Sequence, residues 1–456
     1  MPPPGRWISG ANLGVAAERV SELALLLLAL SLFLAPAGVA AALILLWVGF
    51  IGQLTARWPG LNGAMLSLAR SHPVIRLTVL FVFYCLAQGI VLHLLAAPGP
   101  SPELGTALDW ARISVFVPAA YAVAAKPARL PLLLLLALLG LLGGMLLRLD
   151  WTLLHTDVGA FLGSRPGFGF GAIAFALFSA TALLGLVLLR TRCWYDGGPD
   201  GTRWWRLAGW GLATVLALQG LVMSQSRGTW LAFLTALAMG LWLQWRQRPS
   251  LGSVRGVARS HRALVAVSAL ALLGILSINA GRLSERALEE WDTLQAIATA
   301  QSVPVSETSL SLRWHAQLVG ARLVVERPWF GWGAGTARTL MSTSGEPGVL
   351  YSGGGVLKHL HNTYLQTAVE LGLIGLAILV AIHIGLIATV WQRLGASAGD
   401  HRLSSDLPIF LLAALVLLIV WDLFDYRVIR QDWRGYWTLL AGAALGIGLR
   451  PLRGGR

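Results

Sequence analysis

The sequence predicts an all-α polytopic membrane protein. Of its 456 residues, 56% are hydrophobic and only 12% are charged, and the mean hydropathy is +0.68. Soluble domains carry about 25% charged residues. Apolar runs long enough to cross roughly 30 Å of hydrocarbon recur along the whole length, and a helix is the element that satisfies its own backbone hydrogen bonds within such a span. A single membrane domain is therefore expected to occupy residues 1–456.

Twelve apolar runs are candidate transmembrane helices. The last is short and could also be a tilted or re-entrant segment. In chain order the runs are Val20–Leu34, Val39–Ala56, Val74–Leu95, Thr106–Ala125, Leu130–Leu149, Phe168–Leu189, Leu207–Met223, Thr229–Trp245, Ala263–Ala280, Ala368–Val390, Leu407–Phe424 and Tyr436–Leu449.

The distribution of arginines predicts the orientation of these spans, because cytoplasmic loops retain basic residues during insertion. The connections after the sixth and eighth spans, residues 190–206 and 246–262, are rich in arginine. Placing both in the cytoplasm puts both termini there as well. Residues 281–367, between the ninth and tenth spans, then form a large loop on the outer face, which is periplasmic for a bacterial inner-membrane protein. The net charge of +14 is explained by this topology and by anionic lipid headgroups rather than by nucleic acid.

The outer loop contains two helical patterns and a flexible part. Arg282–Ala300 has one apolar face and is expected to lie on the membrane surface, and Ser309–Glu326 is a second helix that ends before Pro328. The glycines of Gly331–Gly335 permit tight turns and close approach of the backbone to a ligand. Ser342–Gly355, rich in Gly and Ser, could act as a lid.

Three basic side chains at the outer boundary are candidates for binding and transforming an anionic ligand. Arg227 lies in a short turn between two spans, Arg313 on the second loop helix, and His361 just before the tenth span. A guanidinium forms paired, charge-assisted hydrogen bonds with phosphate, and an imidazole can act as a general base near neutral pH. Each also has a plainer interpretation, because boundary arginines often anchor a helix in the membrane and histidines often cap helix ends.

Neither a metal nor another cofactor is expected. The sequence contains no Asp-x-Asp pair and no Cys and His spacing typical of zinc sites. Cys85 lies within the third span and Cys193 in a predicted cytoplasmic connection, so the two are not placed to form a disulfide in the outer loop.

The order of three motifs resembles the bacterial O-antigen ligase and O-antigen polymerase superfamily of membrane glycosyltransferases. They are Ser226-Arg227-Gly228, then Arg313 followed by PWFGWGAG at residues 328–335, then HNTYLQTAVELGLIG at residues 361–375. The span count and the position of the large loop also resemble that superfamily. The resemblance implies metal-independent, inverting transfer of a glycan from an undecaprenyl diphosphate carrier to an acceptor hydroxyl, which could belong to a lipid A core sugar.

The resemblance also implies roles for individual residues. His361 would be the general base, and Arg227 and Arg313 would neutralise the diphosphate leaving group. Arg165, in the segment GSRPGFGFG, resembles a further family element and is a candidate substrate-binding residue that could contact the diphosphate, although the Asn-Pro-Asn that usually follows is missing. The segment HNTYLQT adds Asn362 and Tyr364 as candidate substrate-binding residues.

Two further residues need separate consideration. Arg322 precedes Gly333 at an arginine-x10-glycine spacing found in some polymerases, and it is a further candidate for substrate binding beside Arg165, Asn362 and Tyr364. Glu370 belongs to the last motif, but nine residues at about 100° each would place it on the opposite helix face from His361. It is expected to bond Gln366 or to cap a nearby loop.

Several functions remain open on the sequence. A ligase is favoured. A polymerase of O-antigen or exopolysaccharide is the first alternative, because it uses the same donor chemistry, and a protein O-oligosaccharyltransferase is the second. Outside enzymes, the alternatives are a polytopic transporter of lipid-linked glycans and an envelope scaffold. A transporter would be expected to carry ionisable residues near the bilayer midplane rather than at one face.

Overall fold

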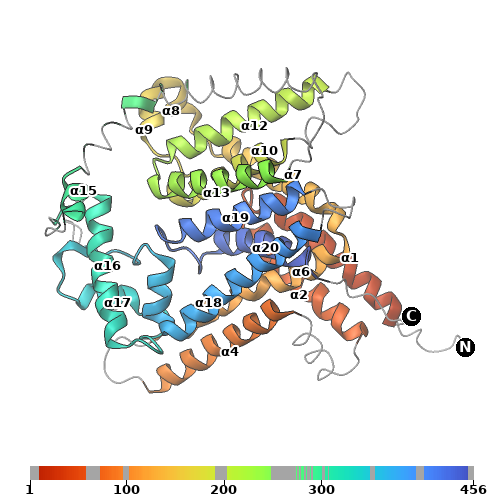
Figure 1. The fold of residues 1–456 in the computed structure, drawn as a ribbon, viewed down its shortest axis with the longest axis horizontal. Helices are drawn as coiled ribbons and strands as arrows, with labels where there is room; N and C mark the ends of the chain where they lie inside the picture. Colours follow the sequence, from red (N-terminus) through yellow and green to blue (C-terminus); the bar gives the residue numbers. More distant parts are fainter. Residues whose placement is uncertain are drawn as a thin grey trace, which may run out of the picture.

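A computed structural model of the chain is all-helical in the part that it describes (Figure 1). Described are residues 10–57, 72–95, 102–190, 203–247, 291–299, 308–349, 355–396 and 405–449, with scattered positions between 274 and 306. Within these described ranges, six helices are long and apolar enough to cross a membrane, and two shorter apolar helices accompany them. The prediction of an all-α polytopic membrane protein is confirmed, whereas the number of crossings stays a prediction.

Every predicted span except the ninth coincides with a described helix or run of helices. The ninth lies largely outside the described residues. In chain order the helices are α1 (Gly10–Ser31), α2 (Pro36–Arg57), α4 (Pro73–Leu94), α5 (Leu104–Ala111), η1 (Arg112–Val115), α6 (Phe116–Ala125), η2 (Pro127–Arg129), α7 (Leu130–Leu147), α8 (Trp151–Thr156), α9 (Val158–Gly163), α10 (Ala172–Leu188), α12 (Arg203–Met223), α13 (Arg227–Arg246), α15 (Trp291–Ala298), α16 (Ser309–Glu326), α17 (Ala337–Thr343), η4 (Pro347–Val349), α18 (Thr363–Ala396), α19 (Asp406–Trp421) and α20 (Gln431–Gly446).

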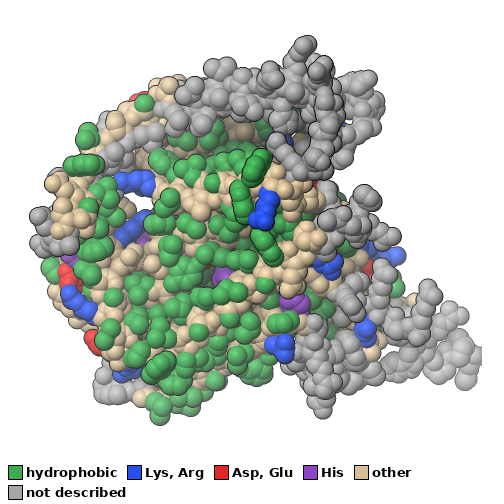
Figure 2. All heavy atoms as spheres, in the orientation of Figure 1, with side chains coloured by type: hydrophobic (Ala, Val, Ile, Leu, Met, Phe, Trp, Pro, Cys, Tyr) green, Lys and Arg blue, Asp and Glu red, His purple; other side chains and the backbone are tan. Residues whose placement is uncertain are grey.

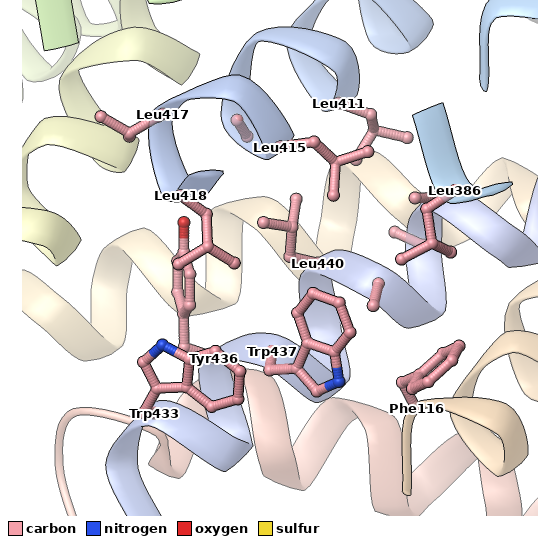
Figure 3. Packing of buried hydrophobic residues seen from close by; sticks show 14 of the residues in the cluster. Phe116, Leu386, Leu411, Leu415, Leu417, Leu418, Trp433, Tyr436, Trp437 and Leu440 are labelled. Carbon is pink, nitrogen blue, oxygen red and sulfur yellow. The ribbon is translucent and has the colours of Figure 1, made fainter. Parts of the chain in front are cut away.

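The last two helices, α19 and α20, bury most of their side chains in the core, part of which Figure 3 shows from close by. The indole of Trp437 stacks on Trp433 at 5.5 Å between ring centroids and meets the edge of Phe116 at 5.5 Å. Small residues let α20 approach α6 closely, and a Cβ at Gly446 would come within 2.7 Å of the carbonyl oxygen of Ala120. Close backbone approach through small residues is typical of helix packing in membranes. The segment predicted as short or re-entrant is therefore a buried core helix.

The loop helices α15, α16 and α17 lie at one end of the bundle, which we call the loop end (Figure 1). The predicted helix Ser309–Glu326 is confirmed with the same bounds. Of the predicted surface helix Arg282–Ala300, the part Trp291–Ala298 is a described helix. In Figure 2 hydrophobic side chains cover much of the surface between the two ends of the bundle, and most charged side chains lie toward the left and right margins. This distribution suits helices that cross a membrane along the horizontal direction of the view.

The long helix α18 is broken at Gly372, whose backbone has φ 70° and ψ 179°. The break is filled by the loop that follows α16. Leu373 donates its N–H to the carbonyl oxygen of Pro328 at 2.7 Å, and Trp332 donates to the carbonyl oxygen of Val369 at 2.8 Å. The loop therefore replaces hydrogen bonds that α18 loses at its break, and it is joined to the helix backbone on both sides.

Glycine is required on the loop side of this junction as well. Gly331, Gly333 and Gly335 all have positive φ, at 66°, 102° and 82°. A Cβ at Gly331 would lie 2.6 Å from the backbone nitrogen of Gly372. The tight turns predicted for Gly331–Gly335 are confirmed, and here they serve a contact between two backbones.

Replacing Gly372 by alanine should destabilise the protein by about 3 kcal/mol or more, because its backbone conformation is nearly exclusive to glycine. The new Cβ would also lie 2.2 Å from the carbonyl oxygen of Trp329. Gly105→Ala in α5 is the matched control, since no atom lies within 4 Å of its Cβ position. Thermal unfolding in detergent should show a much lower midpoint temperature for Gly372→Ala than for the wild type, and nearly the wild-type midpoint for Gly105→Ala. Equal midpoints would contradict the account of the break.

Candidate functional site

His361 occupies a strained turn at the loop end, immediately before α18. Its φ is 52°, a left-handed value that is uncommon for a residue with a side chain. Asn362 ends this turn, because its Oδ1 accepts the N–H of Leu365 at 3.0 Å and caps the first turn of the helix. The chain therefore turns sharply at His361, two residues before α18 begins at Thr363.

A buried carboxylate orients this imidazole. Asp425 Oδ1 lies 3.2 Å from His361 Nδ1, and Asp425 is only 4% exposed. The turn that carries Asp425 follows α19 and is bonded to the start of α18, because Thr363 donates its N–H to the carbonyl oxygen of Asp422 at 2.8 Å and its hydroxyl to Asp422 Oδ1 at 2.9 Å. The carboxylate and the imidazole are therefore held by two elements that are bonded to each other.

The charge on Asp425 decides which nitrogen of His361 carries the proton. Burial by itself raises the pKa of Asp425, but the hydrogen bond with His361 and the basic groups that surround the carboxylate, namely the two histidines and then Arg313, outweigh burial, so the pKa lies below its usual value. An ionised carboxylate can only accept. His361 Nδ1 must then be the donor, and Nε2 is left with a lone pair that can take up a proton.

Arg313 approaches the same pair from the second loop helix. It is half-buried on α16 and its charge acts on Asp425 and on His359. Of the candidate residues predicted from the sequence, the structure thus brings Arg313 and His361 to one place.

Two more of the candidate arginines, Arg165 and Arg227, lie on turns that pack against each other and against the turn of Asp425. Arg165, itself left-handed at φ 51°, donates through Nε and Nη2 to the carbonyl oxygen of Ser224 at 3.1 and 3.0 Å. The turn at Ser224 leads directly to Arg227, which is exposed at the start of α13. A Cβ at Gly228 would lie 2.6 Å from the Phe424 side chain, next to Asp425 in sequence. The turn carrying Arg227 therefore adjoins the turn carrying the carboxylate.

The other predicted substrate-binding residues already have local partners. The hydroxyl of Tyr364 donates to the carbonyl oxygen of Ile419 at 2.9 Å, and the Asn362 amide caps α18. Arg322 pairs with Glu346 at 3.5 Å and its side chain is 66% exposed. It lies nine residues after Arg313, which on a helix means the opposite face and about 13 Å along the axis. The substrate-binding roles of these three residues stay predictions.

Glu370 has the role expected from helix geometry. Its carboxylate accepts from Gln366 Nε2 at 2.7 Å and from Trp110 Nε1 at 2.9 Å, and it is 2% exposed. Gln366 in turn accepts the backbone N–H of Leu360 at 2.9 Å. Glu370 therefore does not orient His361 directly. It fixes the segment before His361 through Gln366.

Three residues at the site were missed by sequence reasoning. Asp425 and Arg427 lie just after the eleventh predicted span, and His359 lies two residues before His361. Arg427 is half-buried and bonded to Asp432 through Nε and Nη2 at 2.9 and 2.7 Å. A signal was present, because WDLFDYR places two carboxylates and an arginine where an apolar span ends.

His359, His361 and Asp425 are residue types that bind transition metals, and their candidate ligand atoms lie within 4.8 Å of one another. Two observations weaken the fit to a divalent cation. The positive charges of Arg313 and Arg427 act on His359. Nδ1 of His359 also accepts a backbone N–H, so the neutral ring carries its proton on Nε2 and has no lone pair left for a metal. This geometry suits an anionic ligand better than a metal.

Comparison with protein-family models matches residues 212–380 to the family described as O-antigen ligase. The matched segment extends from α12 into α18 and includes Arg227, Arg313 and His361. Arg165 and Asp425 lie outside it. No curated protein matches the chain.

Acid should destabilise the protein through His359. Burial, together with the positive charge of neighbouring groups, lowers the pKa of His359 from 6.5 to about 4. Between these values the unfolded chain binds a proton that the folded chain does not, so stability falls as pH falls from about 6.5 to about 4, by at most about 1.4 kcal/mol per pH unit.

Thermal unfolding of wild type and His359→Asn at pH 7.5 and pH 5 tests this expectation. The midpoint of the variant should fall less on acidification than that of the wild type. Exposed His155 provides the control, and His155→Asn should behave as wild type. If His359→Asn lost as much stability as the wild type, His359 would not be the group responsible.

Proposed function

Since residues 212–380 place the chain in the O-antigen ligase and polymerase superfamily, we propose that it transfers a glycan from undecaprenyl diphosphate to an acceptor hydroxyl at the loop end of the bundle. In this proposal the loop end faces the periplasm of a bacterial inner membrane, both termini are cytoplasmic, and the protein acts as a ligase. At the coarser level of the superfamily, the chain is a polytopic membrane transferase.

The observation that carries the proposal is the pairing of His361 with Asp425. With Nδ1 bonded to the carboxylate, Nε2 of His361 can accept the proton of the acceptor hydroxyl. The acceptor oxygen then forms a bond to the anomeric carbon while the bond from that carbon to the diphosphate oxygen breaks. Attack from the face opposite the leaving group inverts the anomeric centre. Asp425 stabilises the imidazolium that results.

The arginines supply the charge that the leaving group requires. Breaking the anomeric bond leaves a lipid diphosphate whose negative charge grows in the transition state. Arg165, Arg227 and Arg313 reach the loop end from three different elements and would bind the diphosphate oxygens. Fixed guanidinium groups can provide this stabilisation without reorganisation during the reaction.

Purified protein, incubated with undecaprenyl diphosphate-linked glycan and candidate acceptors, tests the reaction. Mass analysis of the products separates the possibilities. Glycan on a lipid A core sugar indicates a ligase, an elongated lipid-linked chain a polymerase, and glycan on a protein an O-oligosaccharyltransferase. Unchanged donor under conditions where the protein is folded and the donor is bound would contradict a transferase and favour transport.

His361→Ala should reduce transfer by about 10²- to 10⁴-fold, the usual contribution of a general base. Arg227→Gln and Arg313→Gln should each cost about 10²- to 10³-fold, by comparison with removal of other groups that stabilise a developing negative charge. Arg338→Gln, at an exposed arginine of α17, is the control and should transfer at the wild-type rate. Near-normal transfer by His361→Ala would rule out its role as base.

Asp425→Asn should lower kcat by about 10²- to 10⁴-fold with little change in the KM for donor. An amide can donate to Nδ1 of His361 and so favour the tautomer in which Nε2 carries the proton, which cannot accept another from the hydroxyl. Steady-state kinetics of the folded variant provide the measurement. A change confined to KM would indicate instead that Asp425 acts in binding.

A further inference from the structure

His359 lies beside the proposed base without a role in the steps above. Its ring centroid is 4.1 Å from that of His361 and 5.7 Å from that of Tyr426. Its Nδ1 accepts the backbone N–H of His361 at 3.3 Å. A side chain that accepts the N–H two residues further on is the pattern by which Asn and Asp stabilise turns, here made by an imidazole.

This hydrogen bond holds the residue whose backbone is strained. The left-handed conformation of His361, at φ 52°, costs roughly 1–2 kcal/mol for a residue that is not glycine. Such a conformation persists only where its surroundings fix it. The bond from His359 fixes the N–H side of His361, and Asp425 fixes its imidazole.

The charge state of His359 agrees with this arrangement. An imidazole that accepts at Nδ1 must carry its proton on Nε2 and be neutral. Burial lowers the pKa of His359 to about 4, and the positive charges of Arg313 and Arg427 contribute in the same direction. At neutral pH the ring is therefore an acceptor at Nδ1, as the contact requires.

We propose that His359 is a positioning residue, whose Nδ1 holds the backbone of His361 in its left-handed conformation and thereby aims Nε2 of His361 at the acceptor hydroxyl. The proposal rests on the proposed function, because it assigns His359 an effect on transfer through His361. It differs from direct proton transfer by His359 in requiring only an acceptor atom at the right place.

Two substitutions separate the acceptor from the rest of the ring. Asparagine can present Oδ1 to the same N–H and is itself common in such turns, whereas leucine fills a similar volume without an acceptor. His359→Asn should retain most of the transfer activity. His359→Leu should lose on the order of 10²-fold in kcat at an unchanged KM for the lipid-linked donor, which is the effect of a small misplacement of a reacting group.

The kinetics are compared on protein of verified folding, with His361→Ala assayed in parallel. If His361→Ala transfers normally, the proposed function fails, whatever His359 does. If His361→Ala is inactive while folded His359→Leu has wild-type kcat, the positioning role alone fails. A folded but inactive His359→Asn would also overturn it, because the ring itself would then be needed. This last outcome can be read even if the leucine variant does not fold.

Discussion

The exchange of backbone hydrogen bonds at Gly372 is the contact on which the arrangement of the loop end depends. The second half of α18 donates to the carbonyl oxygens of Pro328 and Trp329, and the first half accepts the N–H groups of Trp332 and Gly333. A broken helix in apolar surroundings would otherwise leave polar groups unpaired at a cost of several kcal/mol. The loop supplies the missing partners. These hydrogen bonds connect the loop after α16, the helix that carries Arg313, to α18, which begins just after His361. We call this connection the joint.

Two buried carboxylates at this joint have separate functions. Glu370 bonds α5 through Trp110 and, through Gln366, the backbone of Leu360, so it determines where the segment before His361 lies. Asp425 bonds the imidazole and determines which nitrogen is protonated. Position and proton chemistry are thus assigned to different acids, one on α18 and one in the turn after α19. This separation explains why the motif at residues 361–375 contains an acid that does not reach the histidine.

Much of the fold could be predicted because it follows from local patterns. The lengths of the apolar runs predicted the spans. The helical spacing of apolar residues before Pro328 predicted α16 with its observed bounds. At the site, Arg313 and His361 were found because charge in an otherwise apolar chain is conspicuous. Asp425 was not, because its role depends on a contact with His361, 64 residues away, and the local cluster of charges in WDLFDYR does not indicate that partner. The break at Gly372 could not be predicted either, because the sequence of α18 is one continuous and largely apolar run.

Strained backbone conformations gather in the turns of the proposed site. Among the described residues, four that are not glycine have positive φ, namely Arg165, Phe168, Gln225 and His361. All four lie in turns at the loop end that carry the candidate arginines or the histidine. Each such conformation costs on the order of 1–3 kcal/mol and persists only where the surrounding structure fixes it. Each turn also has bonds that hold it, such as those from Arg165 to Ser224 and from His361 to His359. The turns can therefore present charged side chains with little freedom to relax, which is the property that stabilisation of a transition state requires.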